Sequence, residues 1–365
     1  MFVYYLLAFS TFVLGTGFTK YRKINYACLF FLLLFLGFFR DVRTGADNVV
    51  YSANFNVITM NPNTWSVYTE FEPGFSWIMA FFKTNISSEY ELFMGFVFLI
   101  FMLGINYIIK KESDNTILSL FFLIILLHYT KSFNIMRQSC ALGLFCFVLP
   151  LVKKGKKELL IYILSIILIT FFIHRSLIIM IVPLFFYLKS FKFILYNRKI
   201  ISTILIFSYL MIYLKEFLYS KVPLLAPYLS FLGERYTGYL YTSVNSDITI
   251  SKLSSLLDVI IGLIIIQWYP KEQKENKFQT FCYASYICSI IVANLLGSLS
   301  DLFLRISLNL AFCRILYFTY LWYHIHGTRP MTLFRIIICC YGFIIFSNAL
   351  IKNFGLVVPY INRLF

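Results

Sequence analysis

Charged residues are scarce in this chain of 365 residues, and acidic residues are half as common as basic ones. Asp, Glu, Lys and Arg together make up 13% of the sequence, with 16 acidic against 32 basic residues. A soluble domain averages about 25% charged residues. Hydrophobic residues reach 60% and aromatic residues 20%. This composition excludes an ordinary soluble domain and predicts an all-α polytopic membrane protein.

Motifs of cytoplasmic nucleotide and hydrolase chemistry are missing. The sequence has no Walker loop, no G-x-G-x-x-G, no H-E-x-x-H and no G-x-S-x-G. All eight cysteines fall inside apolar stretches, and none has the loop spacing of metal ligands. We therefore expect no metal, no cofactor and no disulfide, and a substrate that arrives already activated.

Basic residues stand between the apolar runs rather than on one soluble face. A net charge of +16 would suggest nucleic acid only if it were clustered, so no nucleic-acid partner is expected. Lysine and arginine mark cytoplasmic loops, and here every second loop is basic, which predicts about twelve spans with both termini outside. The first run, 1–19, has no cleavage site and reads as a span rather than a signal peptide. The expected spans are 2–19, 24–39, 89–109, 116–130, 135–152, 158–173, 176–189, 200–218, 253–269, 279–299, 303–323 and 333–352.

Two long segments, 40–88 and 219–252, are expected on the outer side of a single membrane domain, 1–365. The apolar run 75–82 is too short to span, so we expect it in the interface or dipping into the protein. The second segment carries Arg235 among several tyrosines, which suit either an interfacial belt or stacking platforms for sugar rings.

Other basic residues lie inside or at the ends of apolar segments, where charge is costly. Arg137 and the pair His174-Arg175 each lie roughly 23 Å along a helix from the same lysine-rich loop, at about 1.5 Å per residue. Arg40 and Arg305 belong to the same basic belt, whereas Arg314 lies deeper and on the opposite helix face from Arg305. A buried cation needs an anion or a water-filled cavity; snorkelling toward head groups is the alternative. The sequence therefore predicts an outward-facing site for an anionic, lipid-linked substrate.

Few side chains on the outer side can serve as a general base. Asp47 follows Gly45, and Glu72 precedes a Pro-Gly pair that sets a turn; for both, a solvated loop charge is the alternative. Asp41 stands between two arginines and is expected to form an ion pair. His174 adjoins a proposed anion ligand and is the third candidate, so the residues leave the proton acceptor open among His174, Glu72 and Asp47.

Five short pieces recur in a recognisable order along most of the chain. They are Arg43 with Gly45-Ala46-Asp47 and Tyr51; Glu72-Pro73-Gly74-Phe75; Met136-Arg137-Gln138 with Ala141; Phe172-Ile173-His174-Arg175-Ser176; and Arg314-Ile315 with Tyr317-Phe318. As an ordered set they resemble the EpsG-like branch of the Wzy-type polymerases of O-antigen and exopolysaccharide. One departure is Asn48, where an aromatic residue often follows the aspartate.

The resemblance implies a bacterial inner-membrane glycosyltransferase that joins repeat units carried on undecaprenyl diphosphate at the periplasmic face. Its partners would be membrane lipid, a chain-length regulator and other polysaccharide-export proteins. On this reading the substrate diphosphate is bound by Arg137, Arg175, Arg305, Arg314, Arg40 and Arg43. Further substrate contacts come from Gln138, Tyr51 and Arg235.

Two other classes of function fit a polytopic membrane protein. A transporter or flippase of lipid-linked oligosaccharide predicts interrupted spans in matching positions of two halves, and the sequence shows no such symmetry. A membrane acyltransferase of cell-surface sugars predicts a cytoplasmic donor site, whereas the expected cytoplasmic loops are short and rich in lysine.

The topology can be tested with single cysteines at Gly155 and Asn245 in a background without native cysteine. Gly155 lies in a lysine-rich loop and Asn245 in the second long outer segment, so the two cysteines should label from opposite sides of the membrane. An impermeant maleimide applied to intact cells should reach Asn245→Cys only. Labelling of Gly155→Cys in intact cells contradicts the predicted orientation.

Overall fold

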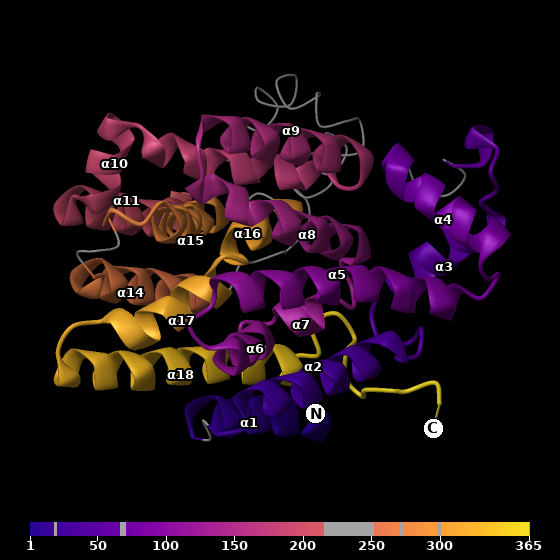
Figure 1. Ribbon diagram of the computed structural model, residues 1–365, viewed down its shortest axis with the longest axis horizontal. Helices are drawn as coiled ribbons and strands as arrows, with labels where there is room; N and C mark the ends of the chain where they lie inside the picture. The colour runs from indigo at the N-terminus through magenta and orange to yellow at the C-terminus, as the bar shows by residue number, and fades with distance from the viewer. Residues whose placement is uncertain (18–19, 66–70, 215–251, 271–273, 298–300, 365) are drawn as a thin grey trace. The chain divides into compact units, whose positions relative to one another are not determined.

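The computed structural model describes residues 1–17, 20–65, 71–214, 252–270, 274–297 and 301–364 (Figure 1). Within these ranges every named element is a helix. One isolated antiparallel β-bridge, also within these ranges, joins Arg40 to Asn362. The prediction of an all-α protein is confirmed. Contacts divide the chain into two compact units, which are described separately below.

The first unit comprises residues 1–178, 318–320 and 339–365. At its core lies α6 (Thr116–Ile125), in which every residue from Ile117 onward is buried. A helix that is apolar on all sides stays in the interior rather than facing water. The other elements are α1 (Phe2–Thr16), α2 (Arg22–Phe38), α3 (Asn48–Val57), η1 (Pro62–Thr64), α4 (Pro73–Asn85), α5 (Tyr90–Glu112), α7 (His128–Lys131), α8 (Met136–Val148), η2 (Leu149–Lys153), α9 (Lys156–Phe172) and the second half of α18 (Thr328–Ile351).

The most extensive helix contact in the described part of this unit is between α5 and α8, which are both labelled in Figure 1. A Cβ added to Gly143 would lie 2.7 Å from the carbonyl oxygen of Ile100 and from the Cα of Phe101, and one added to Gly104 would collide with Gly143. Small residues let helix backbones approach in this way, where dispersion contacts supply the attraction. The close approach fixes where α8 begins, and with it the position of Arg137.

The second unit comprises residues 179–317 and 321–338. Its centre is α15 (Lys277–Leu296), which is buried at every position from Phe278 to Ile290. Around it lie most of η3 (Arg175–Tyr187), α10 (Lys189–Tyr196), α11 (Arg198–Leu210), η4 (Met211–Leu214), α14 (Lys252–Trp268), α16 (Asp301–Ala311) and most of α17 (Arg314–His324).

Four helical stretches in the described ranges are long and apolar enough to cross a membrane. They are Tyr90–Glu112, Met136–Lys153, Lys277–Leu296 and Thr328–Ile351, and a fifth candidate is the pair η3 and α10, which bend by 94°. The membrane character is confirmed, whereas the number of twelve spans is not. Several expected spans form shorter helices, among them α1 and α6.

Two expected spans are broken inside by the backbone. The span 116–130 is interrupted at Leu127, whose φ of 67° is left-handed and which immediately precedes the short helix α7. The span 303–323 is interrupted between α16 and α17, which end and begin at Ala311 and Arg314. Hydropathy does not register such breaks because the residues at them are apolar.

The described part of the first expected outer segment, 40–88, contains the α-helices α3 and α4 and the short 3-10 helix η1. The run 75–82 lies within α4, and α3 precedes it. The second, 219–252, lies outside the described residues except for Lys252. The outer placement of both segments, and the single-domain assignment, stay predictions.

The contact between α5 and α8 can be tested by Gly143→Val. The added side chain meets backbone atoms that cannot rotate away, so we expect a destabilisation of about 1–3 kcal/mol or more. Thermal unfolding of the detergent-purified protein measures it. The control is Gly155→Val, where a Cβ meets only the flexible carboxylate of Glu158, and its effect should stay within about 0.5 kcal/mol. Equal midpoints for the two variants contradict the close approach.

Candidate active site

Glu72 lies at the N-terminal boundary of α4, and its side chain is only 4% exposed. Pro73 occupies the first helical position, where a missing N–H costs nothing, and Glu72 itself is extended. Its carboxylate makes no capping hydrogen bond to its own helix. The charge points instead toward groups from other parts of the chain.

Three groups converge on this carboxylate. Arg137 donates from Nη1 to Oε2 at 2.5 Å, and the backbone N–H of Arg175 donates to Oε1 at 3.1 Å. The Nδ1 atom of His174 lies 3.3 Å from Oε1. Both oxygens of a buried carboxylate are therefore occupied by nitrogen groups, as a buried charge requires. The sequence predicts Arg137 and the pair His174-Arg175 at the same depth in the membrane. In the structure they share one partner, the carboxylate of Glu72.

The local structure explains this convergence. Arg137 is the second residue of α8, His174 lies between α9 and η3, and Arg175 is the first residue of η3. A Cβ added to Gly74 would lie 2.7 Å from the carbonyl oxygen of Phe172. Glycine at this position lets the start of α4 approach the end of α9, which places Glu72 beside His174.

Aromatic side chains hold the guanidinium of Arg137 from another side. Its Nε lies 3.4 Å from the hydroxyl oxygen of Tyr51, and its Cζ lies 4.5 Å above the ring of Phe71. The rings of Tyr51 and Phe71 are themselves in contact, with centroids 5.4 Å apart. A planar guanidinium stacks well on an aromatic face, which a lysine ammonium does not reproduce.

The charge state of Glu72, which lies outside the candidate spans, follows from these neighbours. Burial raises the pKa of the carboxyl, but the hydrogen bond to His174 and the charges of Arg137 and His174 more than offset this effect, and the pKa falls to about 2. Glu72 is therefore an ionised acceptor at neutral pH. A carboxylate this acidic is a poor proton acceptor in its own right.

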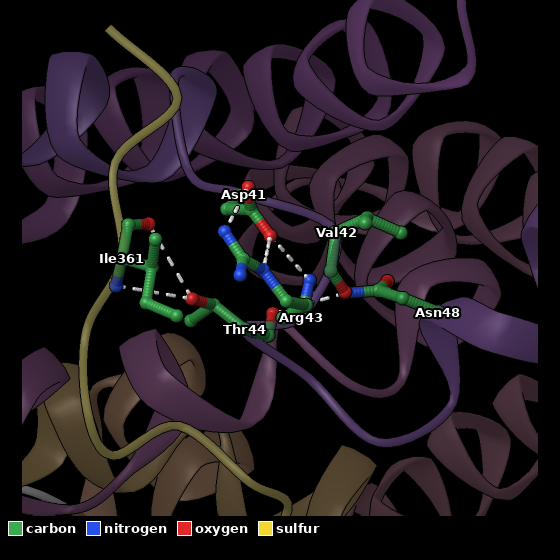
Figure 2. Close-up of polar contacts among 6 residues, drawn as sticks. All are labelled: Asp41, Val42, Arg43, Thr44, Asn48 and Ile361. Carbon is green, nitrogen blue, oxygen red and sulfur yellow. Dashed lines mark hydrogen bonds and ion pairs between the residues drawn. The ribbon is translucent and has the colours of Figure 1, made fainter. Parts of the chain in front are cut away.

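The loop before α3 carries another set of predicted residues. Asp41 accepts hydrogen bonds from the backbone and the guanidinium of Arg43, with the shortest at 2.7 Å (Figure 2). These bonds and the positive charge of Arg43 lower the pKa of Asp41. The expected ion pair of Asp41 is present, with Arg43 as its partner. Asp47 is half-buried at the start of α3, one turn before Tyr51, and Arg40 is fully buried.

Three of the remaining predicted residues are described, one in the first unit and two in the second. Gln138 is buried beside Arg137 in α8. Arg305 on α16 is half-buried and belongs to the second unit. Arg314, in the same unit, lies 3.5 Å from the carboxylate of Asp258 on α14. Arg235 lies outside the described residues. The diphosphate-binding and substrate-binding roles of all of these residues stay predictions.

One feature of the site is not evident from the sequence. The sequence predicts Glu72 and His174 as alternative bases, whereas the structure makes them neighbours in one cluster. Nothing in the sequence indicates which carboxylate meets Arg137.

These helices and this cluster define a helical membrane protein with a buried carboxylate that faces an arginine and a histidine. The model of the EpsG family matches residues 23–362, nearly the whole chain, and the protein belongs to this family. The recognition made from the short pieces is confirmed. No curated protein and no solved structure shows a significant match.

The ion pair at the centre of the site predicts a pH-dependent cost for Glu72→Gln. Removing the carboxylate leaves Arg137 buried without its anion, which costs about 3–5 kcal/mol. The folded pKa lies below the ordinary value of 4.5, so ionised Glu72 stabilises the protein above pH 4.5. This contribution is lost as the pH falls from about 4.5 to about 2, and the difference from wild type should shrink there.

Thermal unfolding between pH 3 and pH 7 checks this expectation. The control is Asp41→Asn, which breaks the pair with Arg43, whose side chain is 69% exposed; exposed pairs contribute about 0–1 kcal/mol. A Glu72→Gln midpoint that equals the Asp41→Asn midpoint at pH 7 rules out a central role for the buried pair.

Proposed function

We propose that this protein is a polysaccharide polymerase of the bacterial inner membrane. It transfers a glycan from undecaprenyl diphosphate to a sugar hydroxyl of another lipid-linked repeat unit at the periplasmic face. The observation that carries this proposal is the cluster of Glu72, Arg137 and His174, together with membership of the EpsG family. In this cluster a proposed proton acceptor, His174, lies beside the cation Arg137 in a buried site.

His174 is the general base of the proposed reaction, and Glu72 orients it. With the proton of the neutral imidazole on Nδ1, facing Glu72 Oε1 at 3.3 Å, the lone pair is on Nε2. A carboxylate that holds a histidine in one tautomer is a recurring arrangement in acid-base catalysis. The lowered pKa of Glu72 suits this orienting role, because the charge of Arg137 and the backbone N–H of Arg175 also favour the ionised carboxylate when His174 is neutral.

The proposed step is a displacement at the anomeric carbon. The acceptor hydroxyl oxygen attacks the carbon that bears the diphosphate, and its proton passes to Nε2 of His174. The bond from that carbon to the diphosphate oxygen breaks, and its electron pair leaves with undecaprenyl diphosphate. The proton on His174 later returns to solvent or to the leaving group.

Arginines supply the charge that the leaving diphosphate requires. In Arg137, Nη1 faces Glu72 and Nε faces Tyr51, so Nη2 is the nitrogen with which it would meet a phosphate oxygen. The guanidinium of Arg175 follows directly on His174 and would provide the second donor. Guanidinium groups bind phosphate oxygens with bidentate geometry and stabilise charge that develops in the transition state.

The pair of Glu72 and His174 favours an enzymatic polymerase over a transporter of lipid-linked sugar. A flippase needs to bind the diphosphate but needs no base beside it, and an acyltransferase needs a donor site on the cytoplasmic side. The cluster lies next to the first long segment, which is expected on the outer side. An acceptor arriving from the periplasm would reach it there.

The test is polymer formation by purified protein with lipid-linked repeat units. We expect His174→Ala and His174→Gln to lose about 10²- to 10⁴-fold in turnover, which is the usual effect of removing a general base. His324→Gln is the matched control, because His324 lies exposed in the second unit and its loss should leave turnover unchanged.

The neighbouring residues sharpen this experiment. Arg137→Lys should lose turnover strongly, since a point charge cannot replace the planar fork. Asp47→Asn should lose only a few fold if His174 is the base. Wild-type turnover in both His174 variants with normal substrate binding refutes this assignment, and a loss in Asp47→Asn above 10²-fold transfers the role to that carboxylate.

A further inference from the structure

Arg40 is a buried cation that the proposed reaction leaves unused. Its side chain is 0% exposed. Nη1 donates to the carbonyl oxygen of Gly37, and the guanidinium lies 5.4 Å from the ring of Phe98 and 4.8 Å from that of Phe133. Across the described ranges, Nε and Nη2 of Arg40 have no hydrogen-bond partner. The two ring faces and one carbonyl oxygen stabilise the positive charge of Arg40. Burial lowers the pKa of its guanidinium to about 10.

The last residues of the chain cover this cation. We name residues 353–363 the C-terminal strap. Asn362 of the strap pairs with Arg40 in the antiparallel β-bridge, flanked by hydrogen bonds from Asp41 N–H to Ile361 and from Arg363 N–H to Phe39, both 3.0 Å. Ile361 also exchanges hydrogen bonds with the hydroxyl of Thr44 (Figure 2).

The strap holds the loop that follows Arg40 as well. The N–H groups of Gly45 and Ala46 donate to the carbonyl oxygens of Leu356 and Gly355, at 3.1 and 3.0 Å. Two further bonds fix the strap to the first two helices: Tyr4 donates to Val357 at 2.9 Å, and Tyr360 donates to Leu36 at 2.7 Å. The loop 39–46 is therefore bonded to the strap along its length.

From this loop two short routes lead to the candidate active site. The first runs through α3, which begins directly after Asp47 and carries Tyr51 one turn later, against Arg137. The second runs through Phe133, which lies under the guanidinium of Arg40, and Asn134, which accepts from the N–H of Asp47 at 3.3 Å. Asn134 comes three residues before Arg137 in the chain.

We propose that Arg40 and the C-terminal strap are positioning elements of the active site. They hold the loop 39–46 and the start of α8, and thereby set Tyr51 and Arg137 against Glu72. This role rests on the proposed function of that cluster. For Arg40 we propose this positioning role in place of the predicted binding of diphosphate, because its side chain is 0% exposed and lies against the two rings.

A pair of glycines offers a matched test of the strap. Gly355 has a φ of 82° and Gly327 a φ of 87°, so alanine imposes a similar backbone strain at either position. A Cβ on Gly355 collides with the side-chain amide of Asn134, whereas one on Gly327 meets only Pro330, at 3.3 Å. Gly355→Ala therefore disturbs the strap at the active-site loop, and Gly327→Ala does not.

Both variants are purified at full length in detergent and measured by hydrogen exchange and by turnover with lipid-linked repeat units. In Gly355→Ala we expect the amides of Gly45 and Ala46 to exchange at least about tenfold faster. We expect kcat to fall about 10- to 100-fold with KM nearly unchanged, the effect of a small misplacement of catalytic groups. Gly327→Ala should show neither effect.

Arg40→Met and Arg40→Lys test the cation. Methionine keeps the volume but removes the charge, so kcat should fall about 10- to 100-fold with KM nearly unchanged. Lysine keeps a cation over the two rings and should restore part of the loss. A rise in KM for the lipid-linked substrate, without faster exchange in the loop, shows that Arg40 binds substrate directly and overturns the positioning role.

The outcomes separate this inference from the proposed function. Faster loop exchange with unchanged kcat, or unchanged exchange in Gly355→Ala, overturns the strap proposal. Full turnover in Glu72→Gln and in His174→Ala, measured with the strap intact, overturns the function of the cluster instead. If the wild-type protein forms no polymer, exchange across 48–57 and 136–140 in Gly355→Ala decides whether the strap orders Tyr51 and Arg137.

Discussion

The pairing of Glu72 with Arg137 is the interaction on which the described site depends. Each charge is costly away from water, and each is stabilised only because the other is beside it. The pair joins the start of α4 to the start of α8, and His174 adds the end of α9 to the same carboxylate. One buried ion pair thus specifies how three helix ends meet.

The positive charges of three buried or half-buried arginines are stabilised by different groups. Arg137 faces a carboxylate, a tyrosine hydroxyl and an aromatic ring. Arg314 lies 3.5 Å from Asp258 in the second unit. Arg40 has two aromatic rings and one carbonyl oxygen in place of an anion. The three arginines therefore differ in the kind of group that faces the buried charge.

Part of the site was predictable from the sequence by counting along helices. Arg137 and His174 are equally far from one lysine-rich loop, so two adjoining helices had to bring them to similar depth. Glu72 could not be chosen as their partner in this way. It lies 65 residues before Arg137, and its place depends on how closely α4 approaches α9 at Gly74.

The backbone breaks at Leu127 and between Ala311 and Arg314 could not be predicted from the sequence either. The residues within these breaks are apolar, and a hydropathy pattern continues across them as one span. Whether a helix continues through such a point depends on its tertiary contacts. Local propensity is too weak to decide this.

The sequence by itself determined that this is an all-helical membrane protein of the EpsG family, with arginines inside or at the ends of its apolar segments. Composition and the order of short motifs are sufficient for this, because the cost of placing charge in an apolar run is a local property. Only the tertiary structure decided that Glu72 and His174 share one site and that the C-terminal strap encloses Arg40. Those outcomes depend on contacts between residues far apart in the chain, where close packing and the pairing of buried charges select one arrangement from many that the same local pattern permits.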